Sequence, residues 1–359
     1  MVEWLAGNRI RGTSAEKPVF GLPSGSAGGW KLLGRNKIGS ATSDFNVPSL
    51  DNKRYYMILT NIQGKNSSGV NWQTRMGNGS INTSSIYGMR YSLNGATDSA
   101  TDNQDYIQSG TNPTDQPQFS VGYIANISGQ SKLYMSRDVN QQTAGAGNAP
   151  KRGEYTGKWK SNDVVDVIGA TTNSSYTMSA DSEMVVLGWD PTDTHTDNFW
   201  EELASVEYNA STPDELDTGT ITAKKYLWVQ AYVNTTGTQD NQAFRFNGNT
   251  GNNYCWEDSQ DGAADVGSSP TAYNYLRTCV GDDNNNFVNA FILNNSGQDK
   301  LIMSSAVKQS TAGTGVAPES NETVGKFTVQ SGQITSIKLW QSGGGSFASG
   351  AIMKVWGHD

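Results

Sequence analysis

The sequence is poor in the residue types that carry most enzyme chemistry. Its 359 residues include two histidines, His195 and His358, and two cysteines, Cys255 and Cys279. A Ser-His-Asp or Cys-His arrangement would have to use one of these histidines. The cysteines have no second pair with which to complete a zinc site, so buried thiols are favoured, with a cross-strand disulfide as the alternative. We expect no catalytic residue, metal or cofactor, and predict that the protein is not an enzyme.

Long apolar runs and a strong basic charge are also missing. No stretch approaches the roughly 20 apolar residues of a membrane-spanning helix, and the opening MVEWLAGNRIRGTSAEKP lacks the apolar core of a secretory signal. The 26 basic and 34 acidic residues leave a net charge of −8, which argues against the basic face that binds nucleic-acid backbones. We expect synthesis in the cytoplasm, no membrane span and no nucleic-acid partner.

What the chain has in abundance predicts strands and turns. It is rich in Gly, Ser, Thr and Asn and carries 10 Trp, 15 Tyr and 10 Phe, a composition that favours strands over helices. Apolar segments such as YYMILTNI (55–62) and KYLWVQAYV (225–233) are separated by turn-forming NG and SG pairs. No long stretch has the 3.6-residue period of an amphipathic helix. The sequence therefore predicts an all-β protein.

One unusual segment occurs twice. Residues 128–150 read SGQSKLYMSRDVNQQTAGAGNAP, and residues 296–318 read SGQDKLIMSSAVKQSTAGTGVAP. Around them, residues 123–159 align with 291–327 without a gap and are identical at 20 of 37 positions. Weaker matches extend outward in both directions. A period of about 170 residues indicates a duplicated domain, because solenoid and propeller repeats are about 20–50 residues long.

The duplication predicts the domain organisation. We expect two tandem antiparallel β-sandwich domains of the jelly-roll type, at residues 29–190 and 199–359. Residues 191–198 would form a short polar linker between them. Residues 1–28 belong to neither repeat and hold Pro and Gly-rich stretches, which predicts an extended N-terminal arm.

The segments QQTAGAGNAP (141–150) and QSTAGTGVAP (309–318) are longer than a strand connection requires, since hairpin loops usually have two to five residues. Two interpretations stay open: each segment packs on its sandwich, or each contacts a partner. For the second interpretation, the candidate contact residues are Gln141, Thr143, Gly145, Gly147, Gln309, Thr311, Gly313 and Gly315.

Other polar positions are weaker candidates, and for each of them a structural role is favoured. Acidic groups that could hold calcium are Asp190, Asp193 and Asp197, and the pair Asp282 and Asp283. Two polar pairs occur at matching positions of the repeats and could bind a sugar: Arg75/Arg245 and Tyr87/Tyr254. The carboxylates Glu154 and Glu322 also match and could serve in acid–base chemistry.

Several motifs resemble virion structural proteins of marine phages and viruses. These are the opening WLAGNRIRGTSAEKP, the turns RMGNGSINTSSIYGMRYSLNG and FRFNGNTGNNYCWEDSQDG, and the KLxMS…TAGxGxAP element. The resemblance implies tandem jelly-roll or lectin-like domains that self-assemble in many copies, as a double jelly-roll capsid shell or a capsid-associated protein. It implies location in the virion after synthesis in the host cytoplasm, with homo-oligomers and other virion proteins as partners. It assigns no role to single residues.

Two hypotheses from other classes remain. A carbohydrate-binding, lectin-like adhesion or receptor-binding module would have surface glycans as partners, since aromatic faces and Asn or Asp side chains in loops bind sugars. A polysaccharide-degrading enzyme ranks third, because the sequence offers no recognisable pair of acid–base carboxylates.

Overall fold

The computed structural model describes residues 29–67, 71–110, 115–172, 176–191, 193, 198–208, 215–236, 241–267, 272–279, 285–309, 314–342 and 346–359. Every regular element in these ranges is a strand, and the strands pair into antiparallel sheets. The predicted all-β class is therefore confirmed. No helix in these ranges has the length and apolar character to cross a membrane. The predicted arm, residues 1–28, and most of the predicted linker lie outside the described residues.

The chain divides into two compact units. Unit 1 is drawn from Met1–Asn140 and Arg152–Trp200, and unit 2 from Gln141–Lys151 and Glu201–Asp359. The segment Gln141–Lys151 is flanked on both sides by parts of unit 1, yet it packs as part of unit 2. This exchange of a segment was not predicted above, and the segment concerned is the first copy of the repeated loop.

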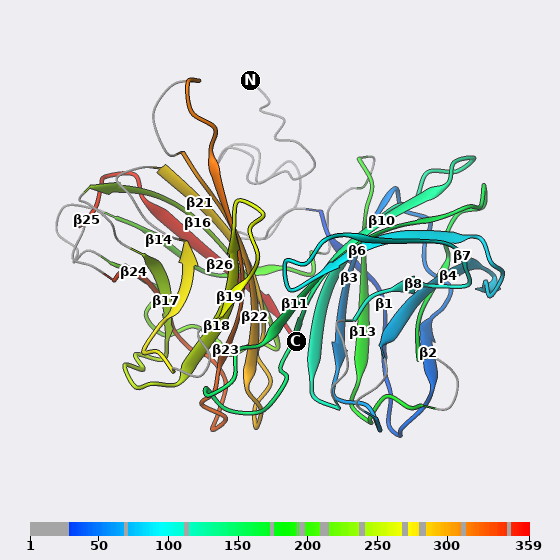
Figure 1. Cartoon of the computed structure of the whole chain (residues 1–359), viewed down its shortest axis with the longest axis horizontal. Coiled ribbons are helices and arrows are strands. Elements are labelled where there is room, and N and C mark those ends of the chain that lie inside the picture. The colour runs from blue at the N-terminus through cyan, green and yellow to red at the C-terminus, as the bar shows by residue number, and fades with distance from the viewer. Residues whose placement is uncertain are drawn as a thin grey trace. The chain divides into compact units, whose positions relative to one another are not determined.

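Unit 1 contains two antiparallel sheets (Figure 1). The larger has eight strands in the order β1 (Lys31–Lys37), β13 (Glu183–Trp189), β3 (Tyr55–Ile62), β9 (Gln118–Ala125), β10 (Lys132–Asn140), β11 (Lys151–Trp159), β6 (Tyr87–Leu93) and β7 (Ser99–Gln104). The smaller has β2 (Asp44–Val47), β12 (Val167–Thr172), β4 (Trp72–Asn78) and β5 (Ser80–Ile81), with β8 (Ile107–Gln108) also paired to β4.

Unit 2 also contains a larger and a smaller sheet. The larger has the order β14 (Glu201–Glu207), β26 (Ile352–His358), β16 (Tyr226–Thr236), β21 (Asn285–Leu293), β22 (Lys300–Lys308), β23 (Glu319–Phe327), β18 (Tyr254–Gln260) and β19 (Val266–Gly267), with β25 (Ser346–Phe347) paired to β16. The smaller has the order β15 (Glu215–Asp217), β24 (Ile337–Gln341), β17 (Gln242–Phe246) and β20 (Leu276–Cys279).

Each unit buries an apolar core to which both of its sheets contribute. In unit 1 the core includes Ile58 and Tyr134 from the larger sheet and Met76 and Ile168 from the smaller. The core of unit 2 is built in the same way. In β10, exposed and buried side chains alternate over its first five residues, because successive residues of a strand point to opposite faces. The fold of each unit is thus β-sandwich-like.

The larger sheets of the two units share their strand order and local irregularities. The run β3-β9-β10-β11-β6 in unit 1 has the counterpart β16-β21-β22-β23-β18 in unit 2. The first strand of each unit pairs with its last, and both pairings contain a register shift at the same place, between Leu32 and Gly34 in β1 and between Glu202 and Ala204 in β14. Residues at matching sequence positions of the two repeats therefore occupy matching positions of the two sheets.

Two repeated glycines mark where the larger sheet approaches the smaller one. A Cβ atom on Gly157 would lie 2.6 Å from Ile107 Cδ1, and one on Gly325 would lie 2.2 Å from Leu276 Cδ1. Ile107 and Leu276 are fully buried. The repeat keeps glycine at both positions because an apolar side chain of β8 or β20 fills the space that a side chain would need.

Candidate functional site

The first copy of the repeated loop is anchored in unit 2 by Asp299. The carboxylate oxygen Oδ2 of Asp299 accepts a hydrogen bond from Gln141 Nε2 at 3.1 Å and another from the Gly145 backbone N–H at 2.9 Å. Oδ1 accepts one from Gln330 Nε2 at 2.9 Å. Asp299 and Gln141 are both buried. The φ of Gly145 is 88°, a conformation that favours glycine.

A buried lysine completes the anchoring. Lys326 is fully buried, and its Nζ donates to the Gln141 carbonyl at 3.0 Å and to the Thr143 carbonyl at 2.5 Å. Burial lowers the pKa of Lys326, an effect that Cys255 and Asp299 oppose. The Cys255 thiol lies 3.2 Å from the Asn148 carbonyl oxygen. We call Cys255, Asp299 and Lys326 the loop seat; it binds mostly the backbone of residues 141–148.

The predicted contact residues of the two repeats have different surroundings. Gln141, Thr143 and Gly145 touch the loop seat of unit 2, and Gly147 lies exposed in the same segment. In this copy the segment packs as part of unit 2 and not on the sandwich of its own repeat, which neither interpretation had specified.

In the second copy, Gln309 bonds to Asn285 through both its backbone N–H (3.0 Å) and its side-chain oxygen (2.9 Å). Gly315 is exposed, as are all residues from 314 to 318. Thr311 and Gly313 lie outside the described residues. A partner contact for this segment stays a prediction.

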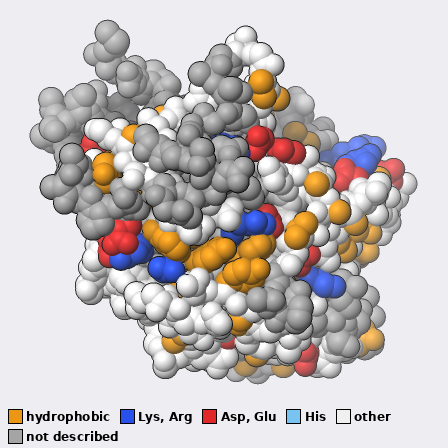
Figure 2. Space-filling model, turned by 60° about the vertical axis from the view of Figure 1, so that its left-hand side comes forward, with side chains coloured by type: hydrophobic (Ala, Val, Ile, Leu, Met, Phe, Trp, Pro, Cys, Tyr) orange, Lys and Arg blue, Asp and Glu red, His pale blue; other side chains and the backbone are white. Residues whose placement is uncertain are grey.

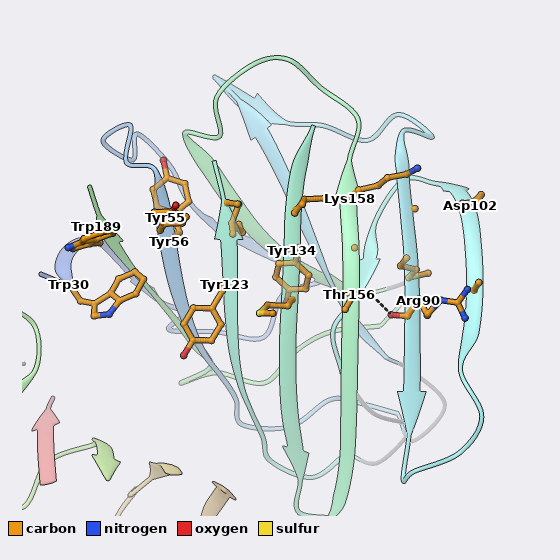
Figure 3. Close-up of a pocket in the computed structure, with 18 of the residues that line it drawn as sticks. Trp30, Tyr55, Tyr56, Arg90, Asp102, Tyr123, Tyr134, Thr156, Lys158 and Trp189 are labelled. Atoms are coloured by element: carbon orange, nitrogen blue, oxygen red, sulfur yellow. Dashed lines mark hydrogen bonds between the residues drawn. The ribbon is translucent and has the colours of Figure 1, made fainter. Parts of the chain in front are cut away.

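Unit 1 has a pocket of about 980 Å³ on the outer face of its larger sheet (Figure 3). Tyr55 and Trp189, stacked with ring centroids 5.5 Å apart, lie at one end with Trp30. Arg90 and Lys158 lie at the other end. Most of the lining between the two ends is apolar. Asp102 lies at the same end as these two cations. This combination of aromatic, apolar and charged groups suits a ligand or peptide segment.

The floor of this pocket carries two unusually exposed apolar side chains. Leu133 is 61% exposed and Met135 is 56% exposed, both on β10. Neighbouring large side chains in unit 1, such as Tyr134, are buried. Apolar surface that is gathered in a concave site, rather than scattered singly, marks a contact surface.

The pocket occupies in unit 1 the position that the loop seat occupies in unit 2. Lys158 pairs with Gly88 between β11 and β6, and Lys326 pairs with Cys255 at the matching point between β23 and β18. Lys326 is buried under the segment 141–148, whereas Lys158 is exposed and its ammonium group has no hydrogen-bond or salt-bridge partner among the described residues. The same place in the two sheets is therefore covered in unit 2 and open in unit 1.

The repeated tyrosines serve the fold. Tyr87 Oη accepts from the Met76 N–H at 3.0 Å and donates to the Met76 carbonyl at 2.7 Å. Tyr254 Oη accepts from the Phe246 N–H at 3.0 Å and donates to the Asn249 carbonyl at 3.2 Å. Both rings are buried, so neither is placed to bind a sugar.

These tyrosines predict a dependence of stability on alkaline pH. Burial raises the pKa of Tyr254 to about 12 from 10, so the folded state holds its proton where the unfolded state releases it. This contribution is complete below about pH 10 and is lost as pH rises toward 12. At pH 8, Tyr254→Phe should lower the free energy of unfolding by about 1–3 kcal/mol, because the Phe246 N–H is left unpaired. By pH 11 the difference in unfolding free energy between the variant and the unsubstituted protein should be smaller by about 1 kcal/mol. Urea unfolding across this range tests it, and a constant gap would refute the assignment.

The repeated arginines have a matching structural role. Arg75 Nε donates to the Asp105 carbonyl at 2.9 Å, and Arg245 Nε donates to the Asn274 carbonyl at 3.1 Å. Arg75 also forms an ion pair with the Asp105 carboxylate. These bonds fix the loop that follows β7 in unit 1 and its counterpart in unit 2.

Further identities of the repeated segment are explained in the same way. Lys132 Nζ donates to the Ile127 and Ser161 carbonyls at 3.0 and 3.2 Å, and Lys300 Nζ donates to the Gln298 and Val329 carbonyls at 2.8 and 2.9 Å. Each lysine thereby caps the turn before its own strand. The repeated KLxMS motif thus preserves a structural cap.

The remaining candidates show no arrangement for chemistry. Glu154 accepts from Arg137 and Arg152 at 2.9 and 3.0 Å and so forms ion pairs within unit 1. Glu322, its repeat partner, accepts from Ser305 at 3.1 Å. Cys255 and Cys279 are buried free thiols, as the favoured interpretation predicts.

The proposed calcium ligands are only partly described. Asp193 pairs with Lys53 and accepts the Asp190 N–H at 2.9 Å. His195, Asp197, Asp282 and Asp283 lie outside the described residues. Within the part of the chain that the structure describes, no three His, Cys, Asp or Glu side chains gather as a metal site would require.

A row of aromatic side chains in unit 2 is a second candidate site, in which Trp256 is buried and the others are half-buried. The ring centroids of Trp256 and Tyr273 are 5.4 Å apart, those of Tyr273 and Tyr275 5.6 Å, and those of Tyr275 and Trp340 6.2 Å. Arg245 lies 3.9 Å over the Trp340 ring. Figure 2 shows one face on which hydrophobic side chains form a band with Lys and Arg side chains at its borders. Such groups also occur where proteins bind sugars.

Sequence reasoning missed both the loop seat and the pocket. Lys158 and Lys326 are among the repeated identities, so the alignment of the repeats held a signal for the two places. It gave no sign that Lys326 binds a carbonyl 185 positions away in the chain, because that contact depends on tertiary packing.

Comparison with known proteins adds little to this geometry. No protein-family model matches the chain, and no curated protein matches it. Among solved structures, the crystal structure of a Pseudomonas aeruginosa FadL homologue is similar at 9% identity and a TM-score of 0.11, over 92% of this chain and 100% of that one. A likeness at this TM-score carries no argument about fold or function.

Proposed function

We propose that the chain is a non-enzymatic structural protein of a virus particle, a capsid shell or capsid-associated protein that self-assembles in many copies. The observation that carries the proposal is the loop seat, where a long loop of one repeat is bound by the other unit through backbone hydrogen bonds and a buried lysine. A sandwich that binds the loop of its neighbour is a module suited to assembly. The motifs that resemble virion proteins supply the particle as the setting.

We further propose that the two units are jelly rolls that arose by internal duplication. The repeat of about 170 residues supports this origin, as do the matching strand orders and the matching register shifts in β1 and β14. The repeated residues Tyr87/Tyr254 make equivalent bonds in the two units, and so do Lys132 and Lys300 through the carbonyls of Ser161 and Val329. A duplicated binding module gives one chain two similar surfaces, which favours assemblies of many copies.

The test is the association state of the purified full chain. We expect sedimentation velocity and electron microscopy to show regular multimers whose fraction rises with protein concentration. A chain that stays monomeric up to its solubility limit would contradict the proposal. In that case the second candidate, a carbohydrate-binding module that uses the aromatic row of unit 2, would be favoured by glycan binding that Trp340→Ala abolishes.

A further inference from the structure

The loop seat of unit 2 is filled from within the chain, whereas its counterpart on unit 1 is open. We propose that the pocket of unit 1 binds residues 309–318 of a second copy of this chain, in the way that the loop seat binds residues 141–148. The inference rests on the proposed self-assembly and specifies the two surfaces that meet. It concerns only an association between chains.

The first argument is the similarity of the two segments. QQTAGAGNAP (141–150) and QSTAGTGVAP (309–318) are identical at seven of their ten positions. The first connects β10 to β11, and the second connects the corresponding strands β22 and β23. Because the seat holds the first segment mainly by its backbone, the side-chain differences leave this mode of binding intact.

The second argument is the lysine that both sites share. Lys326 satisfies two carbonyl oxygens of the first segment. Lys158 occupies the same register position in unit 1, and its ammonium group is exposed. An ammonium group at this place can donate to the carbonyl oxygens of residues 309 and 311, which correspond to Gln141 and Thr143. The charged donor of the seat is thus already present in the pocket.

The third argument is the apolar character that the pocket and the second segment share. The seat residue Cys255, whose thiol contacts the backbone carbonyl oxygen of Asn148, has Gly88 at its place in unit 1. In the second segment Val316 stands at the position of Asn148 and adds an apolar side chain. Leu133 and Met135 supply an apolar surface in the pocket. In unit 1, Ser131 stands at the position that Asp299 has in unit 2. The pocket therefore relies more on apolar contact than the loop seat does.

The partner is a second copy because the two surfaces are both exposed within one chain. Val316 is 54% exposed and Leu133 is 61% exposed. A contact between the pocket of one chain and residues 309–318 of another joins two different surfaces. The first chain keeps its own residues 309–318 free, and the second keeps its own pocket free. Such head-to-tail contacts form closed rings or open filaments, depending on the rotation between neighbours.

Cross-linking of two single variants tests this contact directly. Leu133→Cys places a thiol in the pocket and Val316→Cys places one on the loop, while Cys255 and Cys279 are buried. Under mild oxidation, the mixture of the two variants should form covalent dimers, and neither variant alone should do so. Dimers of Leu133→Cys alone would instead indicate a symmetric contact between pockets and would overturn the proposal.

A charge in the pocket tests the energetic importance of the contact. Leu133→Glu should lower the association constant measured by sedimentation by about 30-fold, as expected for a central interface residue. The matched control is Val266→Glu, at a side chain that is 63% exposed on β19, and it should leave association unchanged. Multimers that resist Leu133→Glu would overturn this contact while the proposed self-assembly stands, whereas a monomeric parent protein would overturn both. If the multimers resist Leu133→Glu but are lost when residues 1–28 are deleted, association depends on the N-terminal arm, and the proposed contact of the pocket with residues 309–318 is overturned.

Discussion

Replacing Asp299 with Ala is expected to lower the free energy of unfolding of unit 2 by about 3–5 kcal/mol. The carboxylate accepts three hydrogen bonds in a buried site, from Gln141, Gly145 and Gln330. It also lies near the buried ammonium group of Lys326 and favours its charged form. The substitution leaves three donors without an acceptor and removes the negative charge that opposes the lysine.

The same substitution should release the segment 141–151 from unit 2. Lys151 and Arg152 lie at its end, so limited trypsin digestion should cut there faster in Asp299→Ala than in the parent protein, while urea unfolding reports the loss of stability. Ser131→Ala is the matched control, because Ser131 is the exposed counterpart of Asp299 in unit 1 and should change stability by less than about 0.5 kcal/mol. Unchanged digestion together with unchanged stability would show that the seat contributes nothing to unit 2.

Replacing Gly325 with Val should lower the free energy of unfolding by about 3 kcal/mol or more. The first carbon of the new side chain would lie 2.2 Å from Leu276 Cδ1, and Leu276 is fully buried in the core of unit 2. A close-packed core has no free volume into which the leucine can move, so the strands must separate or the side chain must leave its rotamer. Thermal unfolding of the variant measures the loss.

A double-mutant cycle separates overpacking from a general effect of valine. In Gly325→Val/Leu276→Ala the shortened side chain makes room, so the two substitutions together should cost less than the sum of their separate costs by at least about 1 kcal/mol. Gly39→Val is the control, because a Cβ on Gly39 has nothing within 4 Å. If the two costs were additive, the close approach of β23 and β20 would not explain this glycine.

The strands were predictable where one segment carries its own signal. The segment 55–62 was expected as a strand from its β-branched and aromatic residues, and β3 covers these residues. The segment DVVDVIGA (163–170) carries a similar run of β-branched residues, yet β12 begins only at Val167. The reason is Asn126, whose side-chain oxygen accepts the Val165 N–H at 2.7 Å and so holds this part of the segment outside the ladder.

The candidate site was predictable only in part. The length and repetition of residues 141–150 and 309–318 identified them as candidates for contact, and the structure places Gln141, Thr143 and Gly145 on the loop seat. The chain gives no local sign of which surface receives them. Asp299 lies 158 positions from Gln141, and only the packing of distant segments brings the two together. The sequence therefore revealed the loop but not its receptor.

The exchange of the segment Gln141–Lys151 has a consequence for how the protein can be divided. The chain passes from unit 1 to unit 2 after Asn140, returns after Lys151 and passes over again after Trp200. Residues 199–359 expressed alone would leave the loop seat uncovered, with Lys326 and Asp299 open to water and without their hydrogen-bond partners in the segment. Residues 29–198 expressed alone would carry the segment without the seat that binds it. A truncation placed at the boundary between the two repeats therefore removes part of a folded unit.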